Sequence, residues 1–324
     1  MKGFDRKFAD FPAYIIDITK EIWEDRGVGA RMKDYYHPDV VVRTPSGIAF
    51  GEPGMTAATM ATINEFPDRQ LLGEDVIWSG DPEHGMLSSH RIYSTATHAG
   101  SGMFGAATGA KLGTRAIADC YAKDNMISDE WLIRDNGAVV RQIGQNPRDW
   151  TRDLIEREGG AALAKMPFTP SVDRDGPYLG RGNDNEWGAK LADILTRMMA
   201  AEFSAISAEY DRACHLEYAG GVSGHGWDAA DAFWLPIRSA FPSAKFEIHH
   251  VIGREDALMS PRAAVRWSLT GSHDGWGGFG APSGAEVHIM GATHAEFGPW
   301  GLRREYTLYD ETAVWKQILI HQGG

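Results

Sequence analysis

Apolar residues recur at steps of three and four positions near the start of the chain and again beyond its middle. The first run is Phe11, Tyr14, Ile15, Ile18, Ile22 and Trp23, and the second is Leu191, Ile194, Leu195, Met198, Met199, Phe203 and Ile206. These steps place the side chains on one face of an α-helix. The pattern therefore predicts two amphipathic helices, each with one buried face.

Short runs rich in β-branched and aromatic residues follow each helical segment. The clearest are residues 40–42, 246–252, 265–270 and 287–290, which Gly, Pro and Asp residues bound. Such runs are typical of β-strands. Helices followed by consecutive strands predict an α+β fold, in which helices pack on a curved antiparallel sheet.

The chain contains an internal repeat. Residues 91–143 align with residues 266–318 at a constant shift of 175 positions, without a gap and with 16 identities in 53 positions. Among the identical pairs are Arg91 with Arg266 and Glu130 with Glu305. A period of this length indicates two copies of a domain and excludes a solenoid of short repeats.

The segment between the copies has a different composition. Residues 145–186 are rich in Gly, Pro and polar side chains, which predicts a linker with one short helix at about 152–158. We therefore expect a first domain over 1–150, a linker over 151–186 and a second domain over 187–324.

Charge and composition narrow the class of protein. The 324 residues carry 32 Lys and Arg against 44 Asp and Glu, a net charge of −12. Binding to nucleic acid requires clustered basic residues, so this balance argues against it. No apolar run is long enough to span a membrane, and the first residues lack the apolar stretch of a signal peptide. With only two cysteines, we expect a cytoplasmic protein without a disulfide framework.

Several short motifs, present in order and in both copies, resemble those of the SnoaL-like polyketide cyclases. They are residues 35–41, the pair Phe66-Pro67, the segments 266–273 and 279–284, and the late segments 127–131 and 302–306. The resemblance implies two tandem cystatin-like or nuclear-transport-factor-2-like cones, each with one apolar pocket. It also implies acid–base chemistry without a cofactor.

One catalytic position of that family is altered here. The family's acid–base aspartate closes the late strand, where this chain has Leu132 and Thr307. Glu130 and Glu305 stand two residues earlier, and a spacing of two keeps a side chain on the same face of a strand. Each glutamate is therefore a candidate base, since burial raises the pKa of a carboxyl group. The alternative is a structural ion pair with Arg91 or Arg266.

Differences between the copies give further candidates. Asp75 corresponds to His250, and Asp119 corresponds to His294. Strand alternation through residues 246–252 predicts that His250 faces the pocket. Imidazole transfers protons near neutral pH, so we expect His294 and Glu305 to act as acid and base. Arg266 and His250 would hold developing charge, and Asp119 and Glu130 are the corresponding catalytic candidates in the first copy.

The remaining candidates concern substrate binding. We expect the substrate to contact tyrosine, tryptophan and polar residues from both copies, namely Tyr35, Tyr210, Trp131, Trp267, Asp75 and Arg91. His98 and His273 follow a strand at a glycine turn, which favours a role in fixing that turn. Adjacent His249 and His250 point to opposite faces of a strand, and no zinc motif is present, so no metal site is predicted.

Three functions remain open from the sequence. The first is an isomerase, cyclase or lyase, free of any cofactor, that acts on a small apolar or aromatic carbonyl or hydroxyl compound. The second is a protein that binds a small molecule or serves as a scaffold without catalysis, built as an intramolecular pseudo-dimer. The third is an epoxide or ester hydrolase with a water held between Asp119 and Arg91. The acidic chain does not favour a strongly anionic substrate, although local pocket charge overrides net charge. Association into a further homo-oligomer is left open.

Overall fold

The structure is a computed structural model that describes residues 1–324, and it divides into two compact units. Unit 1 comprises residues 1–134, 138–145 and 168–180, and unit 2 comprises residues 135–137, 146–167 and 181–324. The segment expected as a linker is thus shared between the two units.

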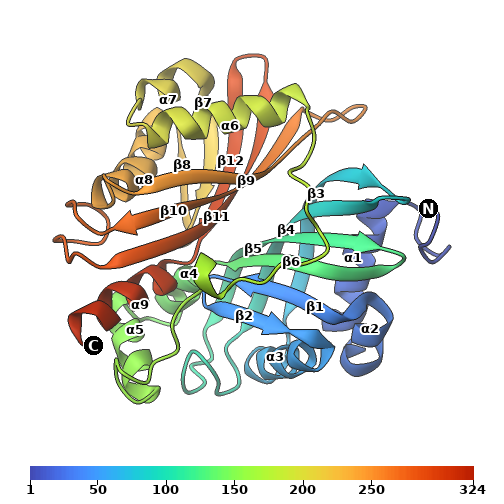
Figure 1. The fold of residues 1–324 in the computed structure, drawn as a ribbon, viewed down its shortest axis with the longest axis horizontal. Helices are drawn as coiled ribbons and strands as arrows, with labels where there is room; N and C mark the ends of the chain where they lie inside the picture. The colour runs from blue at the N-terminus through green and yellow to red at the C-terminus, as the bar shows by residue number, and fades with distance from the viewer. The chain divides into compact units, whose positions relative to one another are not determined.

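Unit 1 is a six-stranded sheet with helices on one face (Figure 1). Its helical elements are α1 (Phe11–Thr19), the π-helix η1 (Lys20–Glu24), α2 (Val28–Tyr35), α3 (Gly51–Glu65) and most of α4 (Asn136–Gln142). Its strands are β1 (Tyr36–Thr44), β2 (Gly47–Phe50), β3 (Gln70–Asp81), β4 (Gly85–Thr97), β5 (Lys111–Lys123) and β6 (Met126–Arg134). The strand order is β2-β1-β6-β5-β4-β3.

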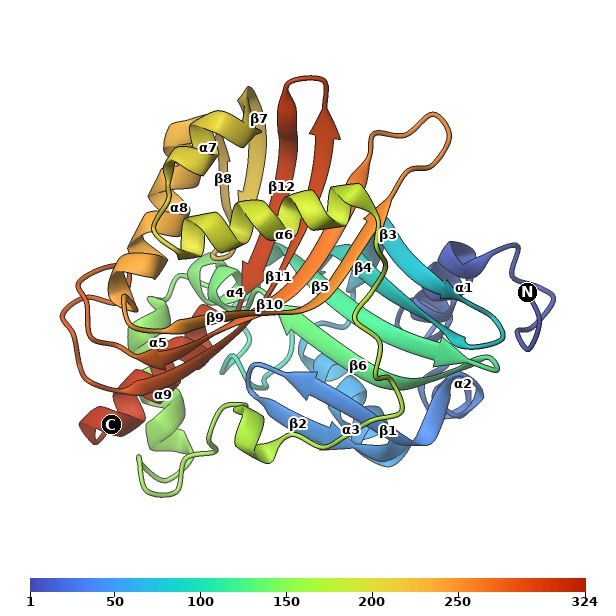
Figure 2. The same ribbon diagram turned by 45° about the horizontal axis from the view of Figure 1, so that its top comes forward.

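Unit 2 repeats this plan. Its helices are α5 (Pro147–Arg157), α6 (Glu186–Met199), α7 (Ser204–Glu209), α8 (Trp227–Ala240) and α9 (Glu311–Gln322). Its strands are β7 (Tyr210–Tyr218), β8 (Val222–His225), β9 (Lys245–Arg254), β10 (Arg262–Ser272), β11 (Glu286–Gly298) and β12 (Gly301–Tyr309), in the order β8-β7-β12-β11-β10-β9. Helix α6 lies across β9 and β10 (Figure 2).

The predicted tandem α+β fold is therefore confirmed, with one refinement. Each sheet contains one parallel pair, β1 with β6 and β7 with β12, so neither sheet is wholly antiparallel. The duplication extends to details. The side chain of Gln142 bonds both backbone groups of Gly113 at 2.8 and 3.0 Å, and Gln317 does the same to His288 at 2.8 and 3.0 Å.

The second amphipathic run is broken into two helices. Helix α6 ends at Met199, and Ala201 has a φ of 67°. A residue in the left-handed conformation cannot continue a right-handed helix. A separate helix, α7, therefore follows, with Phe203 at its N-cap and Ile206 within it. Both segments still direct their apolar side chains into one core.

The segment between the copies is anchored to both units in turn. Its first part forms α5, which packs against α9 and is joined to it by Lys316 and Glu158 at 2.6 Å. Its later part, residues 168–180, lies on the unit 1 sheet, where Arg43 binds Asp173 at 2.5 Å and Asp129 at 2.8 Å. Gly176 lies so close to the Asp129 carboxylate that an added Cβ would overlap it.

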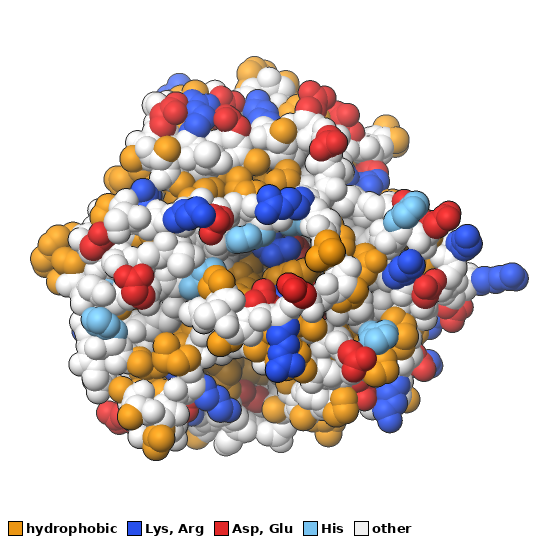
Figure 3. All heavy atoms as spheres, in the orientation of Figure 1, with side chains coloured by type: hydrophobic (Ala, Val, Ile, Leu, Met, Phe, Trp, Pro, Cys, Tyr) orange, Lys and Arg blue, Asp and Glu red, His pale blue; other side chains and the backbone are white.

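Acidic and basic side chains are interspersed on the face of the molecule that Figure 3 shows, and they form no basic patch there. None of the helices has the length and apolar character that a membrane crossing requires.

Candidate active site

The inner face of each sheet is the face that packs against its helices. In unit 2 this face carries Glu305, whose side chain is fully buried. Its Oε2 accepts hydrogen bonds from the hydroxyls of Tyr210 at 2.7 Å and Tyr218 at 2.8 Å. Its Oε1 accepts from Trp234 Nε1 at 3.2 Å and Thr307 Oγ1 at 2.6 Å. Burial raises the pKa of Glu305, and these four bonds oppose the shift.

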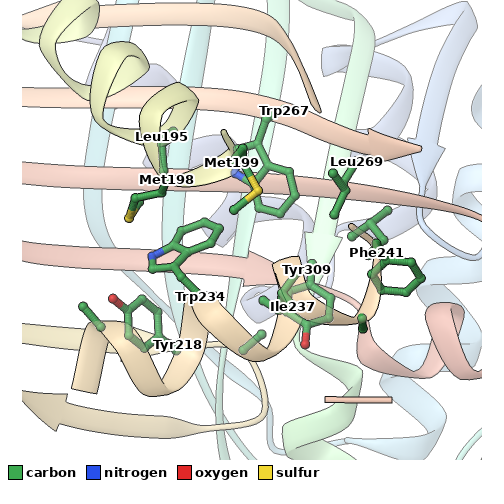
Figure 4. Packing of buried hydrophobic residues seen from close by; sticks show 14 of the residues in the cluster. Leu195, Met198, Met199, Tyr218, Trp234, Ile237, Phe241, Trp267, Leu269 and Tyr309 are labelled. Atoms are coloured by element: carbon green, nitrogen blue, oxygen red, sulfur yellow. The ribbon is translucent and has the colours of Figure 1, made fainter. Parts of the chain in front are cut away.

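Large side chains fill the interior around this carboxylate. Trp234 and Trp267 lie with their ring centroids 5.8 Å apart, and Met198 and Met199 pack beside them (Figure 4). Trp267 also donates to Thr293 at 3.0 Å, which in turn bonds Thr307 at 2.9 Å. Every oxygen of Glu305 is thus engaged by protein donors inside a packed core.

The fit of Trp267 is tight enough to be tested. It pairs with Gly291 on β11, where an added Cβ would lie 2.2 Å from the indole ring. We expect Gly291→Ala to destabilise the protein by about 1–3 kcal/mol through overpacking, measured by urea denaturation. The corresponding pair in unit 1 is Ile92 with Ala116, so Trp267→Ile should rescue Gly291→Ala. A fully stable G291A protein would show that the indole is loosely held.

Unit 1 presents the same glutamate in a different setting. Glu130 lies on the inner face of β6 and is 3% exposed. Its Oε2 accepts a hydrogen bond from Tyr36 at 2.9 Å, and this is its single side-chain bond. Burial raises the pKa of Glu130, while Tyr36 and the charge of Arg134 oppose the shift. The carboxyl group therefore keeps one oxygen free of any protein donor.

A cavity of about 50 Å³ borders this carboxyl group. At two positions unit 1 has a smaller residue where unit 2 has tryptophan, and at a third it has leucine in place of threonine. Thr59, Ile92 and Leu132 stand at the positions of Trp234, Trp267 and Thr307 under the shift of 175. The lining includes Ile15, Ile18, Trp23, Leu71, Ala116, Ala118 and Ile127.

Other polar groups that line the same cavity include His90, Cys120, Arg69 and Arg134. Burial and the neighbouring Arg91 lower the pKa of His90 to about 4, so its imidazole is neutral at pH 7. Its Nε2 has no hydrogen-bond partner. Burial raises the pKa of the Cys120 thiol well above its ordinary value, so this group stays protonated.

The predicted catalytic histidines of the second copy lie on the other side of the sheet. His294 pairs with Tyr306, while Glu305 pairs with Ala295, so His294 and Glu305 point to opposite faces. The structure therefore does not bring His294 and Glu305 together. His250 and Arg266 pair with each other and share the outer face with His294.

A β-bulge explains the error for His250. Between Arg266 and Trp267 the register shifts, and His249 is the extra residue on β9. An extra residue reverses the alternation of faces, so Ile248 faces inward and His250 outward. The first copy has the same bulge at Glu74, which places Asp75 on the outer face opposite Arg91.

The other first-copy candidates also lie on the outer face. Asp119 accepts a hydrogen bond from Ser89 at 2.5 Å, and Arg91 binds Glu74 at 3.0 Å. Neither expected ion pair with a candidate base forms, because Arg91 and Arg266 face away from Glu130 and Glu305. Trp131 faces outward as well, where the Arg43 guanidinium lies 4.5 Å from its ring. These residues do not reach the cavity.

Tyr35, expected to contact the substrate, is not the counterpart of Tyr210. Tyr36 lies beside Ile127 on β6, as Tyr210 lies beside Leu302 on β12, so the shift over these strands is 174. Tyr35 bonds Glu21 at 2.6 Å and Lys7 at 2.7 Å instead. Tyr210 does face inward, and it is Tyr36 that matches it.

Tyr36, Arg69, His90, Cys120 and Arg134 were missed by the sequence reasoning. A signal for three of them was present in the repeat. The second copy has Val265, Ala244 and Tyr309 at the positions of His90, Arg69 and Arg134. A basic side chain therefore stands in only one of the two equivalent interiors. Restricting the comparison to inner-face positions reveals this difference.

His98 and His273 fix their glycine turns, as predicted. His98 Nδ1 lies 3.0 Å from Thr108 Oγ1, and His273 Nδ1 lies 3.0 Å from Ser283 Oγ. No three His, Cys, Asp or Glu side chains are grouped as metal ligands.

Each unit is an α+β domain in which a curved sheet packs against helices and holds one buried glutamate on its inner face. The protein is therefore of the class with two cone-shaped domains in tandem. Residues 191–302 match the SnoaL-like domain family, so the resemblance noted in the sequence is confirmed and unit 2 contains a SnoaL-like domain. A search of curated proteins gives no match.

Several solved structures match this chain over about the length of one copy. One is described as a SnoaL-like polyketide cyclase from Jannaschia sp. CCS1, with 16% identity and a TM-score of 0.35, and the match covers 42% of this chain and 96% of that one. Another is IdmH from Streptomyces antibioticus, described as a polyketide cyclase, with 22% identity and a TM-score of 0.35 over 40% of this chain and 97% of that one. A third is AclR from Streptomyces galilaeus, described as a hydroxylase, with 19% identity and a TM-score of 0.36. That match covers 41% of this chain and 94% of AclR.

Proposed function

We propose that unit 1 is a cofactor-independent acid–base enzyme, an isomerase, cyclase or lyase, with Glu130 as its base. The substrate is a small apolar or aromatic compound with a carbonyl group. The observation that carries this proposal is the free oxygen of Glu130 beside a cavity, in contrast to the fully engaged carboxylate of Glu305.

The chemistry follows from the groups that border the cavity. Glu130 removes a proton from the carbon next to the carbonyl group. The electron pair of that C–H bond forms a C=C bond, and the π pair of the C=O bond moves to the carbonyl oxygen. A buried carboxylate is a stronger base than an exposed one because its charged form is poorly solvated. The positive charge of Arg134 stabilises the enolate oxygen. Return of the proton to another carbon gives an isomer, and attack of the enolate on a second carbonyl gives a ring.

Unit 2 fits the second function, a copy without catalysis. Its glutamate is held by four donors, and tryptophan rings occupy the space where a substrate would lie. A base that is fully hydrogen-bonded has no lone pair directed at a ligand. We therefore assign unit 2 a structural role beside the proposed enzyme in unit 1.

Hydrogen exchange into a panel of aryl ketones and β-dicarbonyl compounds tests the proposal. In D₂O, the protein should speed loss of the α-hydrogen signal in NMR spectra above the rate in buffer. The rate should rise with pH as Glu130 loses its proton, through a pKa above the ordinary 4.5, and then level off. Compounds that bind in the cavity but exchange at the buffer rate at every pH would identify a binding protein instead.

A further inference from the structure

A second cavity of unit 1 adjoins the one beside Glu130. It measures about 240 Å³ and is lined by the end of α3, the π-helix η1 and the residues that lead into β3. Trp23 and Arg69 line both cavities. These two side chains therefore stand at the junction between the outer space and the inner space that holds Glu130.

Arg69 has no anionic partner in the protein. Its Nε donates to Ser94 Oγ at 2.8 Å, and the two terminal nitrogens of its guanidinium have no protein acceptor. The charged group that acts on it is Arg134, which repels it. Burial and this repulsion lower the pKa of Arg69 to about 9, so the group is still protonated at pH 7.

The two carboxylates on the wall of this second cavity accept hydrogen bonds from groups other than Arg69. Glu24 accepts from the backbone N–H of Leu71 at 2.5 Å, and Asp68 accepts from Thr97 at 2.6 and 2.7 Å. The remaining charged residue of that wall, Arg26, is a further cation. The guanidinium of Arg69 therefore has no anionic partner, while both carboxylates of this wall are engaged by other donors.

Unit 2 lacks this feature, because Ala244 stands at the position of Arg69. Arg69 is half-buried, and a half-buried guanidinium without an anionic partner carries a desolvation cost that folding alone does not recover. Its two free terminal nitrogens form a planar fork that matches the oxygens of a carboxylate or phosphate.

We propose that Arg69 binds an anionic group of the substrate, a carboxylate or a phosphate, and so directs the carbonyl end of the molecule into the inner cavity toward Glu130. This inference rests on the function proposed above. It narrows the substrate class to small acids that carry an enolisable carbonyl group.

Phenylpyruvate, its methyl ester and phenyl phosphate serve as probes, with affinities measured by titration calorimetry. We expect the wild-type protein to bind phenylpyruvate at least tenfold more tightly than the uncharged ester. Arg69→Gln should remove this preference by weakening acid binding at least tenfold with little change for the ester, and Arg69→Lys should retain part of it. Whichever of phenylpyruvate and phenyl phosphate loses more affinity in R69Q identifies the anion.

Equal affinity of the wild-type protein for acid and ester would overturn the inference without any variant. Equal losses for acid and ester in R69Q would do the same, since they would indicate altered packing. Glu130→Gln separates the two proposals. If E130Q still exchanges the α-hydrogen of phenylpyruvate while R69Q loses acid binding, the proposed base is wrong and the anion site stands.

Discussion

Glu130→Gln is expected to lower the rate of α-hydrogen exchange by about 10²–10⁴-fold, the usual contribution of a general base. Gln has the shape of Glu and its oxygen still accepts the Tyr36 hydrogen bond, so the fold and the cavity should persist. The measurement is the exchange assay with the best compound of the panel. Glu305→Gln is the matched control, because it changes the equivalent residue of the other copy and should leave exchange unchanged. Equal losses in both variants, with both proteins folded by circular dichroism, would contradict the assignment of chemistry to unit 1.

The same substitution should stabilise the protein. Burial raises the pKa of Glu130 above its ordinary 4.5, so the folded state resists ionisation more than the unfolded state. The wild-type protein therefore loses stability as the pH rises from about 4.5 through the raised pKa. E130Q avoids this loss and should gain about 1 kcal/mol at pH 7, with no gain below pH about 4. Urea denaturation at several pH values measures the difference.

Glu305→Ala is expected to have the opposite effect, a loss of about 3–5 kcal/mol of stability. The change leaves four buried donors without their acceptor, each worth about 1–3 kcal/mol when unsatisfied, although neighbouring hydroxyls can recover part by bonding one another. Trp234 Nε1 cannot, because an indole N–H only donates. Denaturation followed by tryptophan fluorescence reports the loss.

Glu130→Ala provides the comparison for this loss. It frees only the Tyr36 hydroxyl, which borders a cavity, so the cost should stay near 1 kcal/mol. If E305A were as stable as E130A, the four-donor network would not be structural, and Glu305 would become a candidate for chemistry in unit 2.

The architecture was predictable from the sequence because it depends on patterns that repeat. Helical and strand periodicity, together with the shift of 175, predicted two α+β copies, and the structure has the same strand order in both. Glu130 and Glu305 were placed on the inner face because no irregularity lies between them and the end of their strands.

The candidate histidines were misplaced because alternation alone cannot reveal a bulge. One extra residue at His249 turns every later side chain of β9 to the other face. The one-residue offset at Tyr36 has a different cause. Position 35 is also a tyrosine, so the sequence does not show which of the two corresponds to Tyr210. The cavity itself depends on side-chain volumes contributed by several strands and a helix. Only the assembled interior shows that Ile92 leaves a space that Trp267 fills.

The pairing of α5 with α9 has a consequence for the order in which the chain is completed. Helix α5 ends at Arg157 and its partner begins at Glu311, 154 residues later. At a synthesis rate of about 5–20 residues per second, roughly 8–30 s pass before α9 exists. During that interval the apolar side of α5 has left the ribosome without its final cover. The contact between α5 and α9, near the two ends of the unit 2 sequence, therefore forms last. A nascent chain stalled before residue 311 exposes the apolar side of α5 to chaperones.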